Sequence, residues 1–143
     1  MKNKIIFICT GNSCRSQIAE GLFRDEAGDK FEVFSAGSHP SRLHPAAVKV
    51  MAEWGIDIKK QKSEKIDKYL NKGINVVITV CNNAKSSCPN FPETKKIIMH
   101  WSIKDPFHGW NDNEEDLEPY RMARNKIKDK IKDLLQKDKI KNL

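Results

Sequence analysis

A short apolar strand pattern near the start of the chain runs directly into a small polar loop. Residues 4–9 read Lys-Ile-Ile-Phe-Ile-Cys, a continuous run rich in β-branched side chains. Such a run, closed by Gly11, is typical of a strand buried on both faces in a parallel sheet. After the loop, apolar residues recur at helical spacing: Ile18, Ala19, Leu22 and Phe23. The pattern therefore predicts a strand, a loop and a helix in succession.

The rest of the chain alternates in the same way. Apolar runs predict further strands at 31–34, 76–80 and 97–101, and amphipathic patterns predict helices over 45–54 and about 119–138. Strands that alternate with helices indicate an α/β fold. We expect one domain over residues 1–143, with a small four-stranded parallel sheet flanked by helices on both faces. A length of 143 residues agrees with a single domain.

The net charge of +7 is concentrated at the end of the chain. From residue 121 onward there are nine Lys or Arg against three Asp, on the polar face of the last predicted helix. A nucleic-acid-binding module is the alternative from another functional class, and nothing in residues 1–100 supports it. No apolar run approaches the ~20 residues of a membrane span, and no signal-peptide pattern precedes the first strand. We expect a cytoplasmic monomer with neither a nucleic-acid nor a membrane partner.

The loop over residues 9–16 reads Cys-Thr-Gly-Asn-Ser-Cys-Arg-Ser and joins the first strand to the first helix. Successive backbone N–H groups in such a loop form a concave anion site, and the helix N-terminus adds free donors. Arg15 can grip two oxygens of a tetrahedral anion. A thiol in this positive field loses its proton readily, so Cys9 is the candidate nucleophile. The predicted oxyanion-binding residues are Thr10, Gly11, Asn12, Ser13, Cys14, Arg15 and Ser16.

The loop has the Cys-x5-Arg spacing and lacks the Gly-Lys-Ser/Thr ending of ATP-type phosphate loops. A Cys9 buried in the core without chemistry is the alternative interpretation, and the spacing argues against it. The loop resembles the signature of the low-molecular-weight protein tyrosine phosphatase superfamily. That superfamily includes both phosphatases and arsenate reductases coupled to thioredoxin.

The other cysteines decide between those two activities. Cys81 directly follows the strand predicted over 76–80, and Cys88 lies further on, within a polar loop. Structural zinc sites favour close cysteine pairs, but six residues separate Cys81 from Cys88. In the alternative interpretation without redox chemistry, Cys81 belongs to the core and Cys88 to an exposed loop. Cys14 is assigned no redox role.

A redox relay accounts for three thiols. If Cys9 traps an oxyanion covalently, Cys81 can attack it, release the reduced product and form a Cys9–Cys81 disulfide. Cys88 can then attack Cys81, which regenerates Cys9 and leaves a Cys81–Cys88 disulfide. A phosphatase needs neither Cys81 nor Cys88, because water completes its cycle.

Nearly the whole chain resembles thioredoxin-coupled arsenate reductases. The matching motifs are Cys9-Thr-Gly-Asn-Ser-Cys-Arg-Ser-Gln, Ser35-Ala-Gly, Gly55-Ile-Asp-Ile, Val76-Val-Ile-Thr-Val-Cys81, Cys88-Pro, His100-Trp101 and Asp105-Pro106. The resemblance implies arsenate reduction for arsenic detoxification, with Cys9, Cys81 and Cys88 as the redox thiols and thioredoxin as the reductant. It also implies Asp105 as the general acid, Arg15 as the oxyanion ligand, and phosphate or sulfate as weak competitors. A tyrosine phosphatase of the same fold is the alternative.

No organic cofactor is implied. Some members of the family bind potassium near the loop, and the matching positions are Asn12, Glu20, Ser35 and Glu64, where Glu64 replaces a usual Asp. The four histidines have no metal-ligand spacing. His100 is expected to pack near the site and the other three to lie on the surface. Trp54 and Trp110 are assigned no function.

Overall fold

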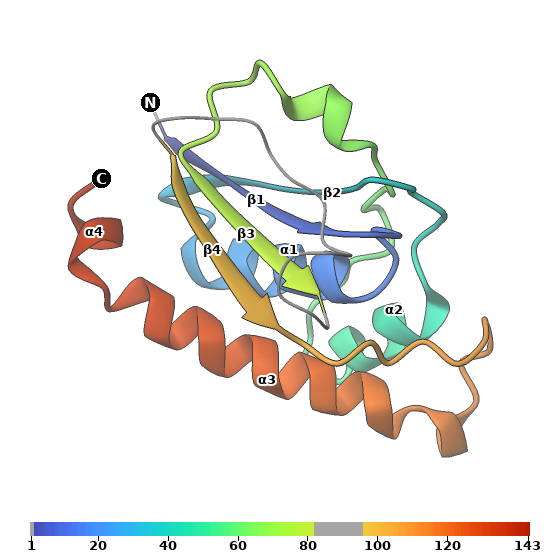
Figure 1. Cartoon of the computed structure of the whole chain (residues 1–143). Coiled ribbons are helices and arrows are strands. Elements are labelled where there is room, and N and C mark those ends of the chain that lie inside the picture. Colours follow the sequence, from blue (N-terminus) through green and yellow to red (C-terminus); the bar gives the residue numbers. More distant parts are fainter. Residues whose placement is uncertain (1, 82–95) are drawn as a thin grey trace.

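Four strands form one parallel sheet in the computed structural model, which describes residues 2–81 and 96–143 (Figure 1). They are β1 (Asn3–Cys9), β2 (Phe31–Gly37), β3 (Val76–Cys81) and β4 (Ile97–Ser102), in the spatial order β2-β1-β3-β4. Every neighbouring pair is parallel. The central strand β3 is buried along its whole length, as its uninterrupted apolar run predicts. The α/β class and the four-stranded parallel sheet are therefore confirmed.

Three α-helices cover one face of this sheet: α1 (Arg15–Ala27), α2 (Pro45–Ala52) and α3 (Glu118–Leu135). Their apolar residues join Ile5 and Phe7 of β1 in the larger core cluster. Ile6 and Ile8, which alternate with those residues, pack on the opposite face against η1 (Ile66–Tyr69). Both faces are covered, and in the described part of the chain the second cover is this 3-10 helix rather than an α-helix.

The last helix differs in length from the prediction. The helix expected over about 119–138 begins at Glu118 and ends at Leu135, after the short helix η2 (Glu114–Asp116). Lys137 is extended, and α4 (Asp138–Lys141) follows it and buries Ile140. Burial of this isoleucine favours the break over a straight continuation into solvent. Among the residues described, no helix combines the length and the apolar character that a membrane span requires.

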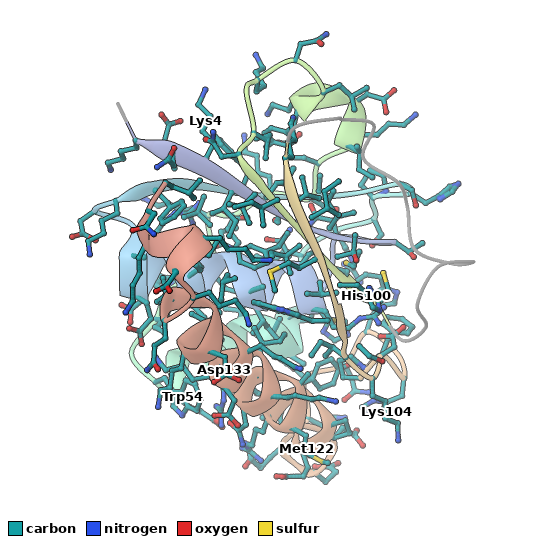
Figure 2. All side chains as sticks on the ribbon, turned by 60° about the vertical axis from the view of Figure 1, so that its left-hand side comes forward. Lys4, Trp54, His100, Lys104, Met122 and Asp133 are labelled. Carbon is teal, nitrogen blue, oxygen red and sulfur yellow. The ribbon has the colours of Figure 1, made fainter. Side chains whose placement is uncertain are left out.

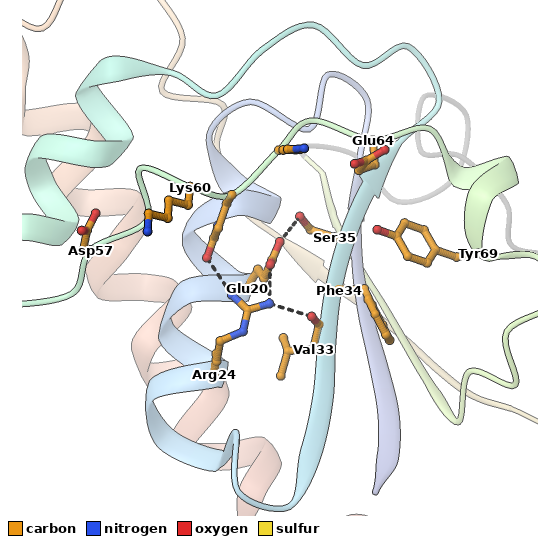
Figure 3. Close-up of a pocket in the computed structure, with 11 residues that line it drawn as sticks. Glu20, Arg24, Val33, Phe34, Ser35, Asp57, Lys60, Glu64 and Tyr69 are labelled. Atoms are coloured by element: carbon orange, nitrogen blue, oxygen red, sulfur yellow. Dashed lines mark hydrogen bonds and ion pairs between the residues drawn. The ribbon is translucent and has the colours of Figure 1, made fainter.

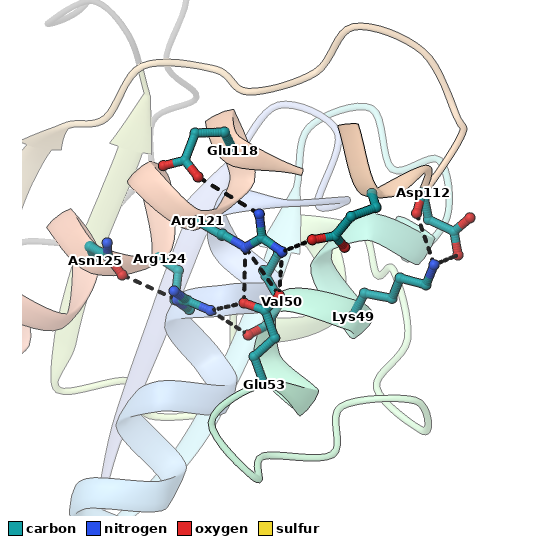
Figure 4. Close-up of polar contacts among 9 residues, drawn as sticks. Lys49, Val50, Glu53, Asp112, Glu118, Arg121, Arg124 and Asn125 are labelled. Carbon is teal, nitrogen blue, oxygen red and sulfur yellow. Dashed lines mark hydrogen bonds and ion pairs between the residues drawn. The ribbon is translucent and has the colours of Figure 1, made fainter. Parts of the chain in front are cut away.

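A network of ion pairs joins α2 to α3 (Figure 4). The carboxylate of Glu53 accepts from Arg121 at 2.6 Å and from Arg124 at 2.7 Å. Arg124 is only 6% exposed and also donates to the Val50 carbonyl at 2.7 Å. Hydrogen bonds from Arg121 and then from Arg124 hold the pKa of Glu53 below its usual value. This network anchors the helix α2, whose first residue follows the segment that donates hydrogen bonds to the loop around Cys9.

The carboxyl ends of all four strands lie at one edge of the sheet. In Figure 2, His100 and Lys104 lie near this edge, whereas Lys4 lies at the opposite end of the strands. Ligand sites of parallel α/β folds are built at the edge where the strands end. Cys9 and Cys81 are the last residues of β1 and β3, so both lie at this edge.

Candidate active site

The loop between β1 and α1 has its carbonyl groups held on the outside. Backbone N–H groups of the following segment donate to them: His39 to Thr10 at 2.9 Å, Ser41 to Gly11 at 3.0 Å and His44 to Ser13 at 3.1 Å. The side chain of Gln17 donates to the Asn12 carbonyl at 3.0 Å. Because these carbonyl groups already accept hydrogen bonds, the backbone groups that the loop can offer to an anion are its N–H donors.

Two residues make this tight loop possible. Asn12 adopts a left-handed conformation with φ of 47°, which asparagine tolerates better than most residues. Gly37, at the end of β2, lies against the loop so closely that a Cβ atom would sit 2.4 Å from the Thr10 carbonyl oxygen. Only glycine fits there, which explains the Ser35-Ala36-Gly37 ending of the second strand.

Cys9 lies at the base of the loop and is 3% exposed. Its Sγ atom is 2.9 Å from the Ser16 hydroxyl, in the first turn of α1. The Asn12 amide donates to the same hydroxyl oxygen at 2.7 Å. Once Cys9 is a thiolate it can only accept, so Ser16 then donates to the sulfur. A donor at this position stabilises the charged form of this candidate nucleophile.

Arg15 and Asp105 meet at the rim of the same pocket. The Arg15 guanidinium, 8% exposed, donates to the Ile103 carbonyl at 3.0 Å and lies 3.5 Å from the Asp105 carboxylate. The Asp105 carboxylate also accepts from the Phe107 N–H at 3.0 Å. The pocket has a volume of about 260 Å³ and is lined by Cys9, Gly11, Ser13, Cys14, Arg15 and Asp105, among others. The predicted nucleophile, anion ligand and proton donor thus line one small cavity.

Most of the remaining residues predicted to bind the oxyanion do not line the pocket. Asn12 and Ser16 are fully buried and act through hydrogen bonds rather than by lining the pocket, and Thr10 is exposed. Cys14 lines the pocket, but burial raises the pKa of its thiol to about 12. It therefore stays protonated at neutral pH, which supports its exclusion from the redox chemistry.

An aromatic wall at the pocket mouth was missed by the sequence reasoning. Phe107 and Trp110 line the pocket, and the Trp110 ring stacks on His44 at a centroid distance of 5.0 Å. His44, expected at the surface, is fully buried. Its Nδ1 accepts from the Ala46 N–H at 2.9 Å, so Nε2 carries the proton and donates to the Gly109 carbonyl at 2.6 Å. Pro45 directly after His44 was the available signal, because proline favours the first helical position and makes its predecessor the N-cap.

The alternation along the strands places Cys9 and Cys81 on different faces of the sheet. Cys9 shares its face with Phe7, whereas Cys81 shares the face of Val77 in the adjacent strand. Both sulfur atoms are buried at the same edge, Cys9 as a free thiol and Cys81 in a disulfide bond. Cys88, the third predicted redox thiol, lies outside the described residues. His100 is exposed, and its Nδ1 is 2.7 Å from the Thr79 hydroxyl.

The four residues predicted for potassium come together, but their oxygens are already occupied. Glu20 accepts from Ser35 and from Arg24, each at 2.5 Å, as Figure 3 shows. The Asn12 side-chain oxygen accepts from the Glu64 N–H at 2.8 Å, and the Glu64 carboxylate pairs with Lys68 at 3.1 Å. A guanidinium occupies the position where a cation would face Glu20, so this arrangement does not fit a potassium ion. In the described part of the chain, no three His, Cys, Asp or Glu side chains gather as a metal site.

The comparisons with known proteins agree with this geometry. The curated arsenate reductase of Bacillus subtilis is 41% identical over 140 residues, which are 97% of this chain and 100% of the relative. A solved structure described as an arsenate reductase in the phosphate binding state superposes with a TM-score of 0.77 at 35% identity, covering 94% of this chain and 97% of the other.

A thioredoxin-dependent arsenate reductase of Corynebacterium glutamicum superposes with a TM-score of 0.74 at 26% identity, over 99% of this chain and 63% of the other. The family model described as low molecular weight phosphotyrosine protein phosphatase matches residues 4–142. Because that match takes in nearly every residue, including the whole anion loop, the chain belongs to the low molecular weight phosphotyrosine protein phosphatase family.

Proposed function

We propose that this protein is an arsenate reductase that uses thioredoxin as its reductant. The observation that carries the proposal is the convergence of Cys9, Arg15 and Asp105 on one pocket suited to a tetrahedral oxyanion. The curated relative of 41% identity is named arsenate reductase, and a solved neighbour is described as thioredoxin-dependent. Cys81, at the same sheet edge as Cys9, is disulfide-bonded in the structure and, once reduced, supplies the second thiol that a reductase needs.

The first step joins Cys9 to arsenic. Arsenate sits in the loop with its oxygens on the backbone N–H groups and on Arg15. The Cys9 thiolate attacks arsenic and forms an S–As bond, while one arsenic oxygen leaves as water after taking a proton from Asp105. Ser16 holds the thiolate before the attack, because its hydroxyl lies 2.9 Å from the sulfur.

The second step reduces arsenic. The Cys81 thiolate attacks the Cys9 sulfur, which forms the S–S bond and breaks the S–As bond. The electron pair of that bond stays on arsenic, so As(V) becomes As(III) and arsenite leaves. In the structure Cys81 is held in a disulfide bond and lies on the opposite face of the sheet from Cys9. That disulfide therefore has to be reduced, and the end of β3 has to turn, before this attack. Cys88 then displaces Cys9 from Cys81, and a thioredoxin dithiol supplies two electrons to the Cys81–Cys88 disulfide.

The same loop also supports phosphate-monoester hydrolysis, since the family model is that of a phosphatase. In that reaction Cys9, Arg15 and Asp105 keep their roles, and water replaces Cys81 as the second nucleophile. Cys81→Ser separates the two activities: reduction is lost, whereas hydrolysis of an aryl phosphate is retained.

The test couples arsenate to NADPH oxidation through thioredoxin and thioredoxin reductase, beside hydrolysis of p-nitrophenyl phosphate. We expect arsenate-dependent NADPH oxidation that Cys9→Ser abolishes and Cys14→Ala retains. Efficient phosphate-ester hydrolysis without any arsenate-dependent oxidation would replace the reductase by the phosphatase. Retained oxidation in Cys9→Ser would overturn the assignment of the nucleophile.

A further inference from the structure

A continuous series of hydrogen bonds connects Arg24, on the outer part of α1, with the Cys9 thiol. The Arg24 guanidinium lies 2.5 Å from one oxygen of Glu20, and the Ser35 hydroxyl donates to the other oxygen at 2.5 Å. The Asn12 amide then donates to Ser35 at 3.0 Å. The same amide donates to Ser16, whose hydroxyl reaches Cys9. Figure 3 shows the outer half of this series, from Arg24 to Ser35.

The direction of each hydrogen bond follows from the carboxylate. An ionised carboxylate only accepts, so Ser35 must donate to Glu20, and the Ser35 oxygen is left to accept from Asn12. The Asn12 side-chain oxygen accepts from the Glu64 N–H, which fixes which end of the amide carries the hydrogens. Both amide hydrogens are used by Ser35 and Ser16. The hydrogen of the Ser16 hydroxyl is therefore available for the Cys9 sulfur.

A second route joins Arg24 to the loop. Arg24 donates to the Gln61 side chain at 3.0 Å, and Gln61 donates to the Gln17 side-chain oxygen at 2.9 Å. Gln17 in turn donates to the Asn12 carbonyl at 3.0 Å. Both routes end on Asn12, the residue with the positive φ on which the shape of the anion loop depends. Arg24 is also held by the Val33 carbonyl at 2.8 Å, so its guanidinium is fixed on three sides.

We propose that Arg24 serves as a built-in cation of the active site, in place of a bound potassium ion. Its guanidinium neutralises and orients Glu20, and through Ser35, Asn12 and Ser16 it sets the hydrogen bond that stabilises the Cys9 thiolate. Arg24 and Glu20 are positioning residues, because neither lines the pocket that contains Cys9. The inference rests on the proposed role of Cys9 as the nucleophile, and it does not depend on which oxyanion the enzyme uses.

The arrangement favours a charged residue at position 24. Glu20 is 8% exposed, and a buried carboxylate is stable only when it is paired and hydrogen-bonded. Without Arg24, one Glu20 oxygen loses its hydrogen-bond partner, and the position of the carboxylate against Ser35 is no longer fixed. Lysine can restore the charge at this position, whereas methionine cannot.

The test measures alkylation of Cys9 by iodoacetamide as a function of pH, for the wild type, Arg24→Met, Arg24→Lys and the surface control Lys126→Met. Trypsin releases residues 5–15 as one peptide, and its fragment ions separate Cys9 from Cys14. We expect Arg24→Met to react about three- to tenfold more slowly at neutral pH, with the midpoint of its profile moved to higher pH, because a hydrogen bond to the thiolate is weakened. The alkylation rate and the profile midpoint of Arg24→Lys should be close to those of the wild type. The profile of Lys126→Met should be the same as that of the wild type.

Each arm has an outcome that overturns the proposal. An Arg24→Met profile that superposes on the wild type removes Arg24 from the series. An Arg24→Lys profile as slow as that of Arg24→Met shows that the charge is not the cause. A thermal midpoint of the wild type that rises in KCl but not in tetramethylammonium chloride of equal concentration shows that a potassium ion binds after all. Alkylation requires no arsenate turnover, so a failure of the proposed reductase activity leaves this test intact.

Discussion

The Arg15 guanidinium lies 3.5 Å from the Asp105 carboxylate at the rim of the anion loop. The contact joins the first turn of α1 to the segment that leaves β4, two parts of the chain that are far apart in sequence. It holds the proposed proton donor beside the proposed oxyanion ligand. It also means that an incoming anion meets a carboxylate of the same sign, which repels it.

Asp105→Asn should separate binding from turnover. We expect arsenate turnover to fall about 100-fold, because the leaving oxygen loses its proton donor. Phosphate should bind as tightly as in the wild type or about fivefold more tightly, because a negative charge near the anion is gone. Steady-state kinetics and calorimetric titration with phosphate measure the two quantities, with exposed Asp129→Asn as the control. Unchanged turnover would remove Asp105 from the mechanism.

Cys88→Ser should stop the relay after one cycle. The variant retains Cys9 and Cys81, so one equivalent of arsenite per enzyme is released and a Cys9–Cys81 disulfide accumulates. Quantification of arsenite and peptide mass spectrometry after a single addition of arsenate measure both products. Multiple turnovers with thioredoxin, or a single turnover without this disulfide, would contradict the proposed order of thiols.

Stability should fall when His44 takes up a proton. Burial lowers the pKa of His44 below its usual value of 6.5, and its Nδ1 accepts from the Ala46 N–H, a contact that the protonated ring loses. Between the lowered folded pKa and 6.5, the unfolded chain binds more protons than the folded chain. The contribution of His44 is therefore present above pH 6.5 and is lost as the pH falls through the folded pKa.

Thermal unfolding monitored by tryptophan fluorescence measures this effect. The experiment covers about pH 7.5 to 5, at least one pH unit on each side of the usual histidine pKa. His44→Gln should have a flatter dependence of the melting temperature on pH than the wild type, and His39→Gln should keep the wild-type slope. Equal slopes for His44→Gln and the wild type would contradict the assignment to His44.

Glu53→Gln should loosen the junction between α2 and α3. Arg124 is buried, so loss of its carboxylate partner should cost about 1–2 kcal/mol of unfolding free energy, a value already reduced for the partial exposure of Glu53. The lowered pKa of Glu53 places its contribution above pH 4.5, and this contribution is lost as the pH falls through the lower folded value.

Urea unfolding at neutral pH and at pH 3.5, about one pH unit below the usual glutamate value, measures both effects of the Glu53 variant. The difference between Glu53→Gln and the wild type should shrink at the lower pH. Glu115→Gln, at an exposed position on η2, is the matched control. A constant difference at both pH values would show that the carboxylate charge is not what stabilises the junction.

Local patterns were sufficient for most of the architecture. The apolar run at 4–9 and the buried run at 76–80 both became central strands, since a strand covered on both faces has to be apolar at every position. The Cys9-x5-Arg15 spacing predicted an anion loop, and both residues line the pocket. These features depend on neighbours a few residues apart, which is the range over which sequence patterns carry information.

The contacts that complete the site join distant segments. Phe107 and Trp110 form the pocket wall only because His44, Gly109 and Tyr120 are brought together, and His44 was wrongly expected at the surface. The contact of Arg24 with Glu20 follows from their spacing of four residues on one helix. The hydrogen bonds to Ser35 and Gln61 join different segments, so helical spacing does not predict them. The face on which Cys81 lies depends on the register of β3 against β1.

The sequence by itself determined the α/β order of elements, the anion loop and the thiol chosen as nucleophile, because each is encoded in a short continuous stretch. Only the tertiary structure decided what surrounds them: the Asp105 contact with Arg15, the aromatic wall and the cation that faces Glu20. Those depend on hydrogen-bond directions and burial between segments that approach each other only in the folded chain, where a guanidinium can take the position that a potassium ion was expected to occupy.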